Sequence, residues 1–221
     1  MDIMSRKEKE KQVRKENLIN AAEKIFSTMG YTGASMDEIA KEAEFSRKTL
    51  YQYFKDKESL YFTVVVRGFK RLLSFFQEAI KNNNTGLEKL QCLASAYYRF
   101  YQTFPSTLEI MNYVGYVKIR GKFSAEYQEF NKINELMTQE ITKVIDEGKL
   151  DGSIRTDLDT LSITYSAEFL ITGFFHMLSV SGKTFTTYHS LKQEDFINFN
   201  LNLLCDAFCA EKHNFDNNKH S

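Results

Sequence analysis

The sequence predicts an all-α protein, and three observations support this. The 221 residues include one proline, ten glycines and no tryptophan. Average usage would give about 11 prolines and about 15 glycines, so the residues that end helices and form β-turns are scarce. Apolar residues make up 43% of the chain, which is enough for a folded core. Their spacing follows a helical period, and no stretch shows the alternation of a half-buried strand.

Three helices are expected near the amino terminus. Apolar residues spaced three and four apart begin near Val13 and stop at Gly30, as they would before a glycine that follows a helix. Ser35-Met36-Asp37-Glu38 has the Ser-x-x-Glu form of a capping box, which predicts a short second helix ending near Glu44. Ser46 is the candidate N-cap of a third short helix. Two short helices joined by a tight turn form a helix-turn-helix pattern.

Six more helices are expected in the remainder of the chain. A long one runs from Asp56 or Lys57 to about Lys81, where the segment 82–86 is a clear break. Ser190-x-x-Gln193 has the form of another capping box, at the start of the last helix. The five stretches after the break lie near 87–103, 107–120, 124–147, 158–180 and 191–210, separated by Pro105, Gly121, residues 148–152 and Ser181-Gly182.

Charge is unevenly distributed, although the formal net charge is zero, from 29 basic and 29 acidic residues. A uniformly basic protein that coats nucleic acid is therefore excluded, but a local basic face is not. Residues 1–15 carry a net charge of +3 and residues 45–57 carry another +3, whereas 16–44 carry −4 and 58–221 carry −2. Positive charge is thus concentrated in the amino-terminal arm and around the third helix, where it would suit a phosphate backbone.

The sequence lacks the patterns that indicate an enzyme, a secreted protein or a membrane protein. It has no Walker loop, no His-Glu-x-x-His, no Gly-x-Ser-x-Gly and no dinucleotide-binding fingerprint. The charged amino terminus does not resemble a secretory signal, and the longest uncharged run, 169–182, is too short to span a bilayer. Three cysteines are too few for a disulfide framework. We expect a soluble, cytoplasmic protein that is not an enzyme, needs no cofactor and has no membrane partner.

A metal or redox sensor is the alternative raised by the last predicted helix. Cys205, Cys209 and His213 are four residues apart and share a helix face. Three ligands from one helix cannot easily surround a zinc ion, and cysteine often packs as a small apolar residue. We therefore expect no metal site.

The segment from Gly30 to Leu60 holds the most informative motifs. They are Ile39-Ala40, Ser46-x-x-Thr49-Leu50-Tyr51-x-Tyr53-Phe54 and Lys57-Glu58-x-Leu60. Together they resemble the DNA-binding domain of the TetR family of transcriptional repressors. The resemblance covers about the first 60 residues closely, and the rest matches in the number and length of its helices. It implies a helix-turn-helix DNA-binding domain over 1–56 and a ligand-binding and dimerisation domain over 57–221.

The third helix is expected to read DNA. A helix that enters the major groove presents its first turn to the base edges, and Arg47, Lys48 and Thr49 occupy that turn. Lysine or arginine can donate to guanine, and a threonine methyl group can touch the methyl group of thymine. Tyr53 is equally suited to packing, and Lys57 to an ordinary solvated position. The predicted DNA contacts are Thr32, Ser46, Arg47, Lys48, Thr49, Tyr51, Tyr53 and Lys57.

Two positions depart from the family pattern. Glu44 stands before Phe45 where a glycine is usual, and that position commonly needs a left-handed backbone, which costs a non-glycine residue about 1 kcal/mol. Lys48 is long and charged where many relatives have a small residue, which leaves the base preference open.

The carboxy-terminal body is rich in aromatic residues, most of which suit the core of a helical bundle. The resemblance implies an apolar ligand cavity between its middle helices. The predicted lining residues are Phe100, Tyr101, Phe104, Met111, Tyr127 and Phe174. The last two long helices are apolar on broad faces, which the resemblance explains as a four-helix dimer interface. The predicted interface residues are Leu161, Tyr165, Phe169, Phe196, Phe199 and Leu203.

The resemblance therefore implies a repressor that binds a pseudo-palindromic operator in double-stranded DNA as a homodimer. A dimer would set two recognition helices about one DNA turn, ~34 Å, apart. A bulky, mainly apolar small-molecule effector would release the DNA. The alternative is a helical binding protein that holds an apolar ligand without binding DNA, and the basic patch at 45–57 argues against it.

Overall fold

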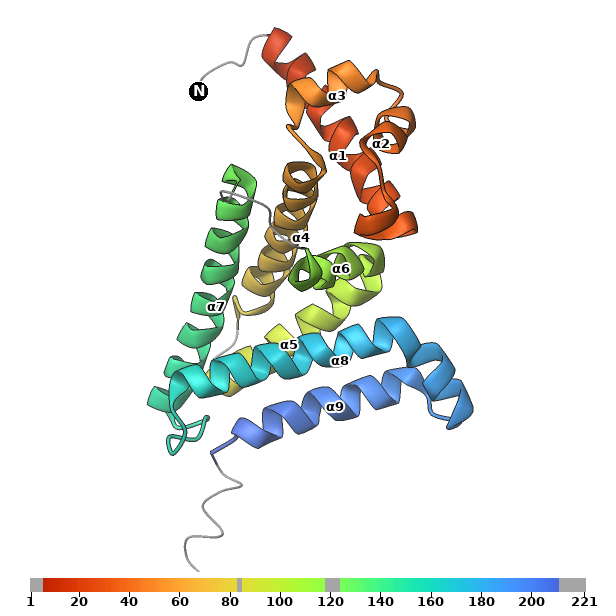
Figure 1. Cartoon of the computed structure of the whole chain (residues 1–221). Coiled ribbons are helices and arrows are strands. Elements are labelled where there is room, and N and C mark those ends of the chain that lie inside the picture. The colour runs from red at the N-terminus through yellow and green to blue at the C-terminus, as the bar shows by residue number, and fades with distance from the viewer. Residues whose placement is uncertain (1–5, 83–84, 118–123, 211–221) are drawn as a thin grey trace, which may run out of the picture. The chain divides into compact units, whose positions relative to one another are not determined.

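The computed structural model of the chain describes residues 6–82, 85–117 and 124–210. Within these ranges the chain forms nine α-helices and one short 3-10 helix, and the predicted all-α class is confirmed (Figure 1). The elements are α1 (Arg6–Gly33), α2 (Met36–Glu42), α3 (Arg47–Tyr53), α4 (Lys57–Ala79), α5 (Gly86–Thr103), α6 (Pro105–Asn112), the 3-10 helix η1 (Tyr113–Tyr116), α7 (Ala125–Asp151), α8 (Thr160–Tyr188) and α9 (Gln193–Phe208). None of the helices in the described ranges is long and apolar enough to cross a membrane.

Several helices are longer than predicted because their glycines do not all act as breaks. Gly30 has a φ of +67° and a non-helical backbone, so the helical path does break there. In contrast, α7 continues past Gly148 and α8 continues past Gly182, and the breaks predicted at both glycines are wrong. Gly148 instead allows close packing, because a Cβ built on it would lie 2.5 Å from the Ile154 side chain. The backbone of α5 also approaches it closely, since a Cβ built on Gly86 would lie 2.2 Å from the Gly148 backbone. A glycine inside a helix costs about 1 kcal/mol relative to alanine, so it can stand wherever packing requires it.

Other differences lie at the helix ends. The first helix already begins at Arg6, well before the apolar stripe that predicted it. The stretch predicted over 107–120 is α6 followed by η1, and its last three residues lie outside the described ranges. Both changes occur where the residues are polar or aromatic and the apolar spacing gives little guidance.

Capping boxes form at two helix starts. Ser35 caps α2 as predicted, since its Oγ accepts from the Glu38 N–H at 3.2 Å while the Glu38 carboxylate accepts from the Ser35 N–H. Thr85 caps α5 in the same way. The box predicted at Ser190 is wrong. Because α8 extends to Tyr188, Ser190 falls in the turn that closes that helix, with a φ of +54°.

One compact unit consists of the described residues up to Lys70 and from Ser106 to Ile133. It contains α1, α2, α3, the first part of α4, α6, η1 and the first residues of α7. Its core includes the fully buried side chains Leu18, Ile39, Leu50, Leu60 and Phe62. The helix-turn-helix is therefore packed on the same core as α6.

The second compact unit consists of the described residues from Arg71 to Pro105 and from Asn134 onward. In it, α5 packs against α8 and α9, and α8 packs against α9. Phe175 of α8 is fully buried, with its ring 5.2 Å from the rings of Tyr97 and Tyr101 on α5. The two units are defined by packing alone, and packing groups α6 with the first unit. They do not test the functional boundary predicted at residue 56, which stays a prediction.

Candidate nucleic-acid interface

The turn between α2 and α3 is closed by backbone hydrogen bonds. Glu44 has a φ of +57°, the left-handed conformation that was expected at this position. The Glu44 N–H donates to the Lys41 carbonyl at 3.1 Å, and the Phe45 N–H donates to the Ala40 carbonyl at 3.0 Å. Ser46 then caps α3, because its Oγ accepts from the Thr49 N–H at 3.1 Å. The two helices of the motif are thus joined by a defined turn, which sets the direction of α3.

Arg47 and Lys48 begin α3 and differ in their partners. The Arg47 guanidinium forms two bonds to Asp37 of α2, at 3.0 and 3.2 Å, and lies 5.6 Å from the ring centre of Tyr51. The hydrogen bond with Tyr51 and the charge of Asp37 raise the pKa of Arg47. Lys48 is exposed, and its side chain makes no hydrogen bond or ion pair within the described ranges. Pattern reasoning missed Asp37, because its link to Arg47 depends on the angle between two helices.

The remaining α3 residues divide between an inner and an outer face. Leu50 is fully buried and anchors the helix to the core of the first unit. Tyr51 is 42% exposed, whereas Tyr53 is half-buried and packs against that core, the packing alternative given above. Thr49 is half-buried, and its hydroxyl lies 2.9 Å from that of Ser46. The outer face of α3 therefore holds its exposed side chains, which are Arg47, Lys48, Tyr51 and Gln52.

Lys57 and Thr32 are engaged inside the first unit. The Lys57 ammonium lies 2.7 Å from the carbonyl oxygen of Tyr31, 2.8 Å from that of Ala34 and 3.5 Å from that of Thr32. An ammonium has three donors, so these carbonyls occupy it, and Lys57 is not an ordinary solvated lysine. The Thr32 hydroxyl lies 3.1 Å from the hydroxyl of Tyr113. The DNA contacts predicted for Lys57 and Thr32 stay predictions. To contact DNA, each side chain would have to break its present hydrogen bonds or share them with a phosphate.

The six predicted ligand-lining residues fall in both units. Met111 and Tyr127 belong to the first unit, where the Tyr127 ring packs edge-on to Phe62. The other four belong to the second unit, and Phe100 is fully buried there with its ring 5.4 Å from Phe104. These contacts are those of packed core side chains, and the predicted cavity stays a prediction. The four residues of the second unit are Phe100, Tyr101, Phe104 and Phe174.

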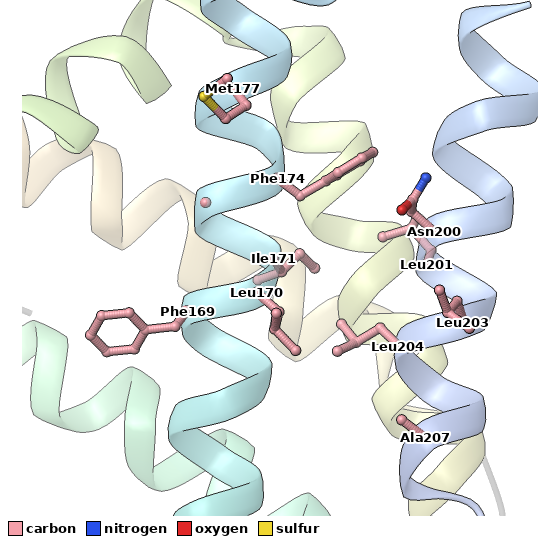
Figure 2. A pocket seen from close by; sticks show the side chains of 11 residues that line it. Phe169, Leu170, Ile171, Phe174, Met177, Asn200, Leu201, Leu203, Leu204 and Ala207 are labelled. Carbon is pink, nitrogen blue, oxygen red and sulfur yellow. The ribbon is translucent and has the colours of Figure 1, made fainter. Parts of the chain in front are cut away.

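An open groove of about 520 Å³ lies between α8 and α9 (Figure 2). Asn200 is the polar side chain among lining residues that are otherwise apolar, and Phe169 and Leu203 are both predicted interface residues. Phe169 is 78% exposed, and Phe199 on α9 is 63% exposed. Of the predicted set, Leu161, Tyr165, Phe169, Phe199 and Leu203 are exposed in the single chain, and Phe196 is half-buried against Phe174 and Phe185. Uncovered apolar surfaces are typical of interaction sites.

The cysteines of the described ranges do not form a metal site. No group of three or more potential ligands is found there. Cys205 is buried, and burial raises the pKa of its thiol to about 12, which keeps it protonated. His213, the third member of the predicted alternative, lies outside the described residues.

Comparison with known proteins identifies a family for part of the chain and two curated relatives. Residues 18–64 match the family described as bacterial regulatory proteins, tetR family. The chain is 34% identical over 87 residues to the HTH-type transcriptional activator FasR of Mycolicibacterium smegmatis, a match that covers 39% of this chain and 40% of that protein. It is 29% identical over 140 residues to the negative transcriptional regulator IcaR of Staphylococcus aureus, covering 62% of this chain and 72% of that protein.

Solved structures share the fold over most of the chain. A bacterial regulatory protein of the tetR family from Rhodococcus RHA1 aligns with a TM-score of 0.70 and 17% identity, covering 89% of this chain and 97% of that one. The transcriptional regulator FadR from Bacillus subtilis aligns with a TM-score of 0.68 and 21% identity, covering 86% and 97%. Because the matched segment contains the whole capped helix-turn-helix, residues 18–64 form a DNA-binding domain of the TetR family, and the chain as a whole shares the fold of the two regulators above.

Proposed function

We propose that this regulator represses transcription by binding a pseudo-palindromic operator as a homodimer through α3. The observation that carries the proposal is the outer face of α3, where Lys48 and Tyr51 stand exposed on a helix that is capped and anchored. A rigid helix with an unpaired cation in its first turn suits base readout in the major groove. Repression is favoured by the match to IcaR, a negative regulator, although the match to FasR, an activator, is also significant. The family assignment disfavours the alternative of a ligand carrier without DNA, and we propose that the protein acts in the cytoplasm.

The side chains around α3 are proposed to divide between base and phosphate contacts. Lys48 and Thr49 face the base edges, because they lie in the first turn of α3. Tyr51 and Arg47 contact phosphates, and the bond of Arg47 to Asp37 holds its guanidinium in one orientation. Lys57 acts indirectly. Its ammonium binds the carbonyl oxygens of Tyr31 and Ala34 and so holds the start of α4 against the end of α1.

The partner proposed for the groove between α8 and α9 is a second copy of the chain. Phe169, Phe199 and Leu203 leave apolar side chains uncovered on two long neighbouring helices. Two such faces related by a twofold axis can cover each other and form a four-helix interface. A dimer also gives the two recognition helices that a pseudo-palindrome requires.

The proposed effector is a bulky, mainly apolar molecule such as a long-chain acyl compound. The support is indirect: FadR from Bacillus subtilis was solved in complex with stearoyl-CoA, and its fold resembles that of this chain. α6 offers a route for the signal, because the Tyr61 hydroxyl of α4 donates to the Ile110 carbonyl of α6 at 2.6 Å. The Thr107 hydroxyl of α6 also donates to Glu23 of α1 at 2.5 Å. An effector that shifts α6 therefore acts directly on the unit that holds the helix-turn-helix.

DNA binding is tested by selecting preferred sequences from a random duplex library with the full chain. The expected result is an inverted repeat with half-sites about one helical turn apart. Lys48→Ala and Thr49→Ala should change the selected bases, whereas Tyr51→Phe should weaken binding to all duplexes alike. Lys41→Ala, an exposed lysine of α2, is the matched control and should leave the selected sequence unchanged. Identical, uniform losses in all four variants would contradict the roles assigned to α3.

Dimer formation is tested by light scattering at micromolar concentration. The wild-type chain should have the mass of a dimer, and Phe199→Glu or Leu203→Glu should give a monomer, because a buried carboxylate without a partner is costly. Leu150→Glu is the control, since Leu150 of α7 is 88% exposed and lies on neither α8 nor α9. A monomeric wild-type chain would overturn the proposed interface.

The effector is tested with stearoyl-CoA, stearic acid and short-chain acyl-CoA. A molecule that binds the folded chain raises its thermal midpoint, and it releases DNA only if it binds the DNA-free state more tightly. The long-chain compounds should do both, and the short-chain compound should do neither. If none of them alters either the midpoint or DNA binding, the acyl-chain class is excluded.

A further inference from the structure

We propose that the first turns of α1 and the end of α3 form a second DNA-contacting site, which binds the phosphate backbone. The inference rests on the DNA binding proposed above, and it concerns residues that precede the matched family segment, 18–64. The site is a cleft of about 440 Å³. It is lined by Lys7, Glu10, Lys11 and Arg14 of α1 and by Gln52 and Tyr53 of α3.

The wall contributed by α1 is strongly cationic. Lys7, Lys11 and Arg14 are spaced by four and three residues, so they lie on one face of the helix. Within the described ranges none of the three side chains makes a hydrogen bond or an ion pair, and all three residues are exposed. Glu10 is the acidic lining residue, and its carboxylate is already paired at 3.1 Å with Arg6, which does not line the cleft. A cleft with one dominant sign of charge concentrates ions of the opposite sign.

The opposite wall connects the cleft to the recognition helix. Gln52 and Tyr53 are the last residues of α3, directly after the exposed Tyr51. Their amide and hydroxyl groups can donate to phosphate oxygens. The cleft therefore adjoins the face of α3 that is proposed to contact DNA. This position favours the backbone of a DNA duplex over other polyanions as its ligand.

Packing among the described residues does not account for the first turns of α1. All the residues from Arg6 to Lys15 are exposed, and the first buried residue of the helix is Leu18. A helix that is polar on all sides gains little from tertiary burial. A partner outside the described residues would explain why Lys7, Lys11 and Arg14 are gathered there without a side-chain partner. Basic amino-terminal segments of this kind commonly bind nucleic acid.

The test measures how DNA affinity depends on salt concentration. Each phosphate contact contributes about 0.9 to the slope of log affinity against log salt. The Lys7→Gln/Lys11→Gln variant should therefore reduce the slope by about 2. The reduction should be equal on the duplex selected by the wild-type chain and on a scrambled duplex, because phosphate contacts carry no sequence information. The Lys9→Gln/Lys15→Gln variant removes the same charge from residues of α1 that do not line the cleft, and its slope should change by less than half as much.

The outcomes separate this site from the function on which it depends. If both double variants reduce the slope equally, general charge and not the cleft is responsible, and the site is refuted. If neither changes the slope while the wild-type chain binds its selected duplex, the site is refuted and the role of α3 stands. A wild-type chain that binds no duplex overturns both proposals. All four lysines are exposed, so circular dichroism should show equal thermal midpoints for both variants.

Discussion

Replacing Glu44 by glycine should stabilise the helix-turn-helix. Glu44 has a φ of +57°, which places its Cβ close to the following carbonyl oxygen. A non-glycine residue in this conformation is strained by roughly 1–2 kcal/mol. Its side chain is exposed and makes no hydrogen bond or ion pair within the described ranges, so nothing offsets the strain locally.

The expected gain follows from two opposing effects. Glycine relieves the strain, but it also increases the conformational entropy of the unfolded chain, which costs about 0.4–1 kcal/mol. The free energy of unfolding should therefore rise by about 0.5–1 kcal/mol for Glu44→Gly. Glu44→Ala keeps both the strain and the Cβ, so it should leave stability within about 0.5 kcal/mol of wild type.

Hydrogen exchange of the α2 and α3 amides in increasing urea is the appropriate assay, because it reports on this unit alone. Both variants remove the same negative charge beside α3, so any common gain in DNA affinity reflects electrostatics. A stability gain confined to the glycine variant reflects the backbone. If Glu44→Gly is no more stable than Glu44→Ala, the left-handed strain assigned to this turn is refuted.

Three further predictions follow from single contacts. Lys57→Met should lower the free energy of unfolding by about 1–2 kcal/mol, because the carbonyls that its ammonium binds lose their donor; an effect on DNA affinity without loss of stability in urea would contradict this role. Gly86→Ala should cost about 3 kcal/mol or more, because the new Cβ would lie 2.2 Å from the Gly148 backbone; an unchanged thermal midpoint would show that α5 and α7 can separate at no cost. Hydrogen bonds with Ser153 and with the Gly86 N–H lower the pKa of Asp151. Its stabilising effect is therefore present above the usual pKa of 3.8 and is lost as pH falls through the lowered pKa. The difference in thermal midpoint between wild type and Asp151→Asn should shrink in acid, and a difference that is constant with pH would refute the linkage.

Local signals in the sequence were sufficient where the structure is also local. The capping box at Ser35, the break at Gly30 and the left-handed backbone at Glu44 each depend on residues within one helical turn, and each is found as predicted. The role proposed for the third helix rests on the same short segment. Such features can be predicted from sequence because the interacting groups are only a few residues apart.

Features that depend on distant residues could not be predicted in this way. Lys57 lies beside Asp56 and Glu58 in the sequence, yet its ammonium binds carbonyl oxygens more than twenty residues earlier. Gly148 and Gly182 resemble helix breaks, but both lie inside helices, where an added Cβ would meet the side chain of Ile154 or of Leu178 respectively. The cleft between α1 and α3 forms only when the two helices are folded together, although the net charge of the amino-terminal arm indicated its chemistry.

The placement of α6 in the first unit bears on how an effector would release DNA. Two hydrogen bonds, from Tyr61 to Ile110 and from Thr107 to Glu23, join α6 to α4 and α1. Breaking one such bond and leaving its partner unsatisfied costs about 1–3 kcal/mol, so breaking both costs about 2–6 kcal/mol, whereas typical coupling between two ligand sites is about 1–3 kcal/mol. An effector of ordinary strength therefore has too little coupling energy to detach α6 from the unit. We expect α6, α1 and the helix-turn-helix to move together as one body, so the effector would act by changing the spacing between the two recognition helices of a dimer.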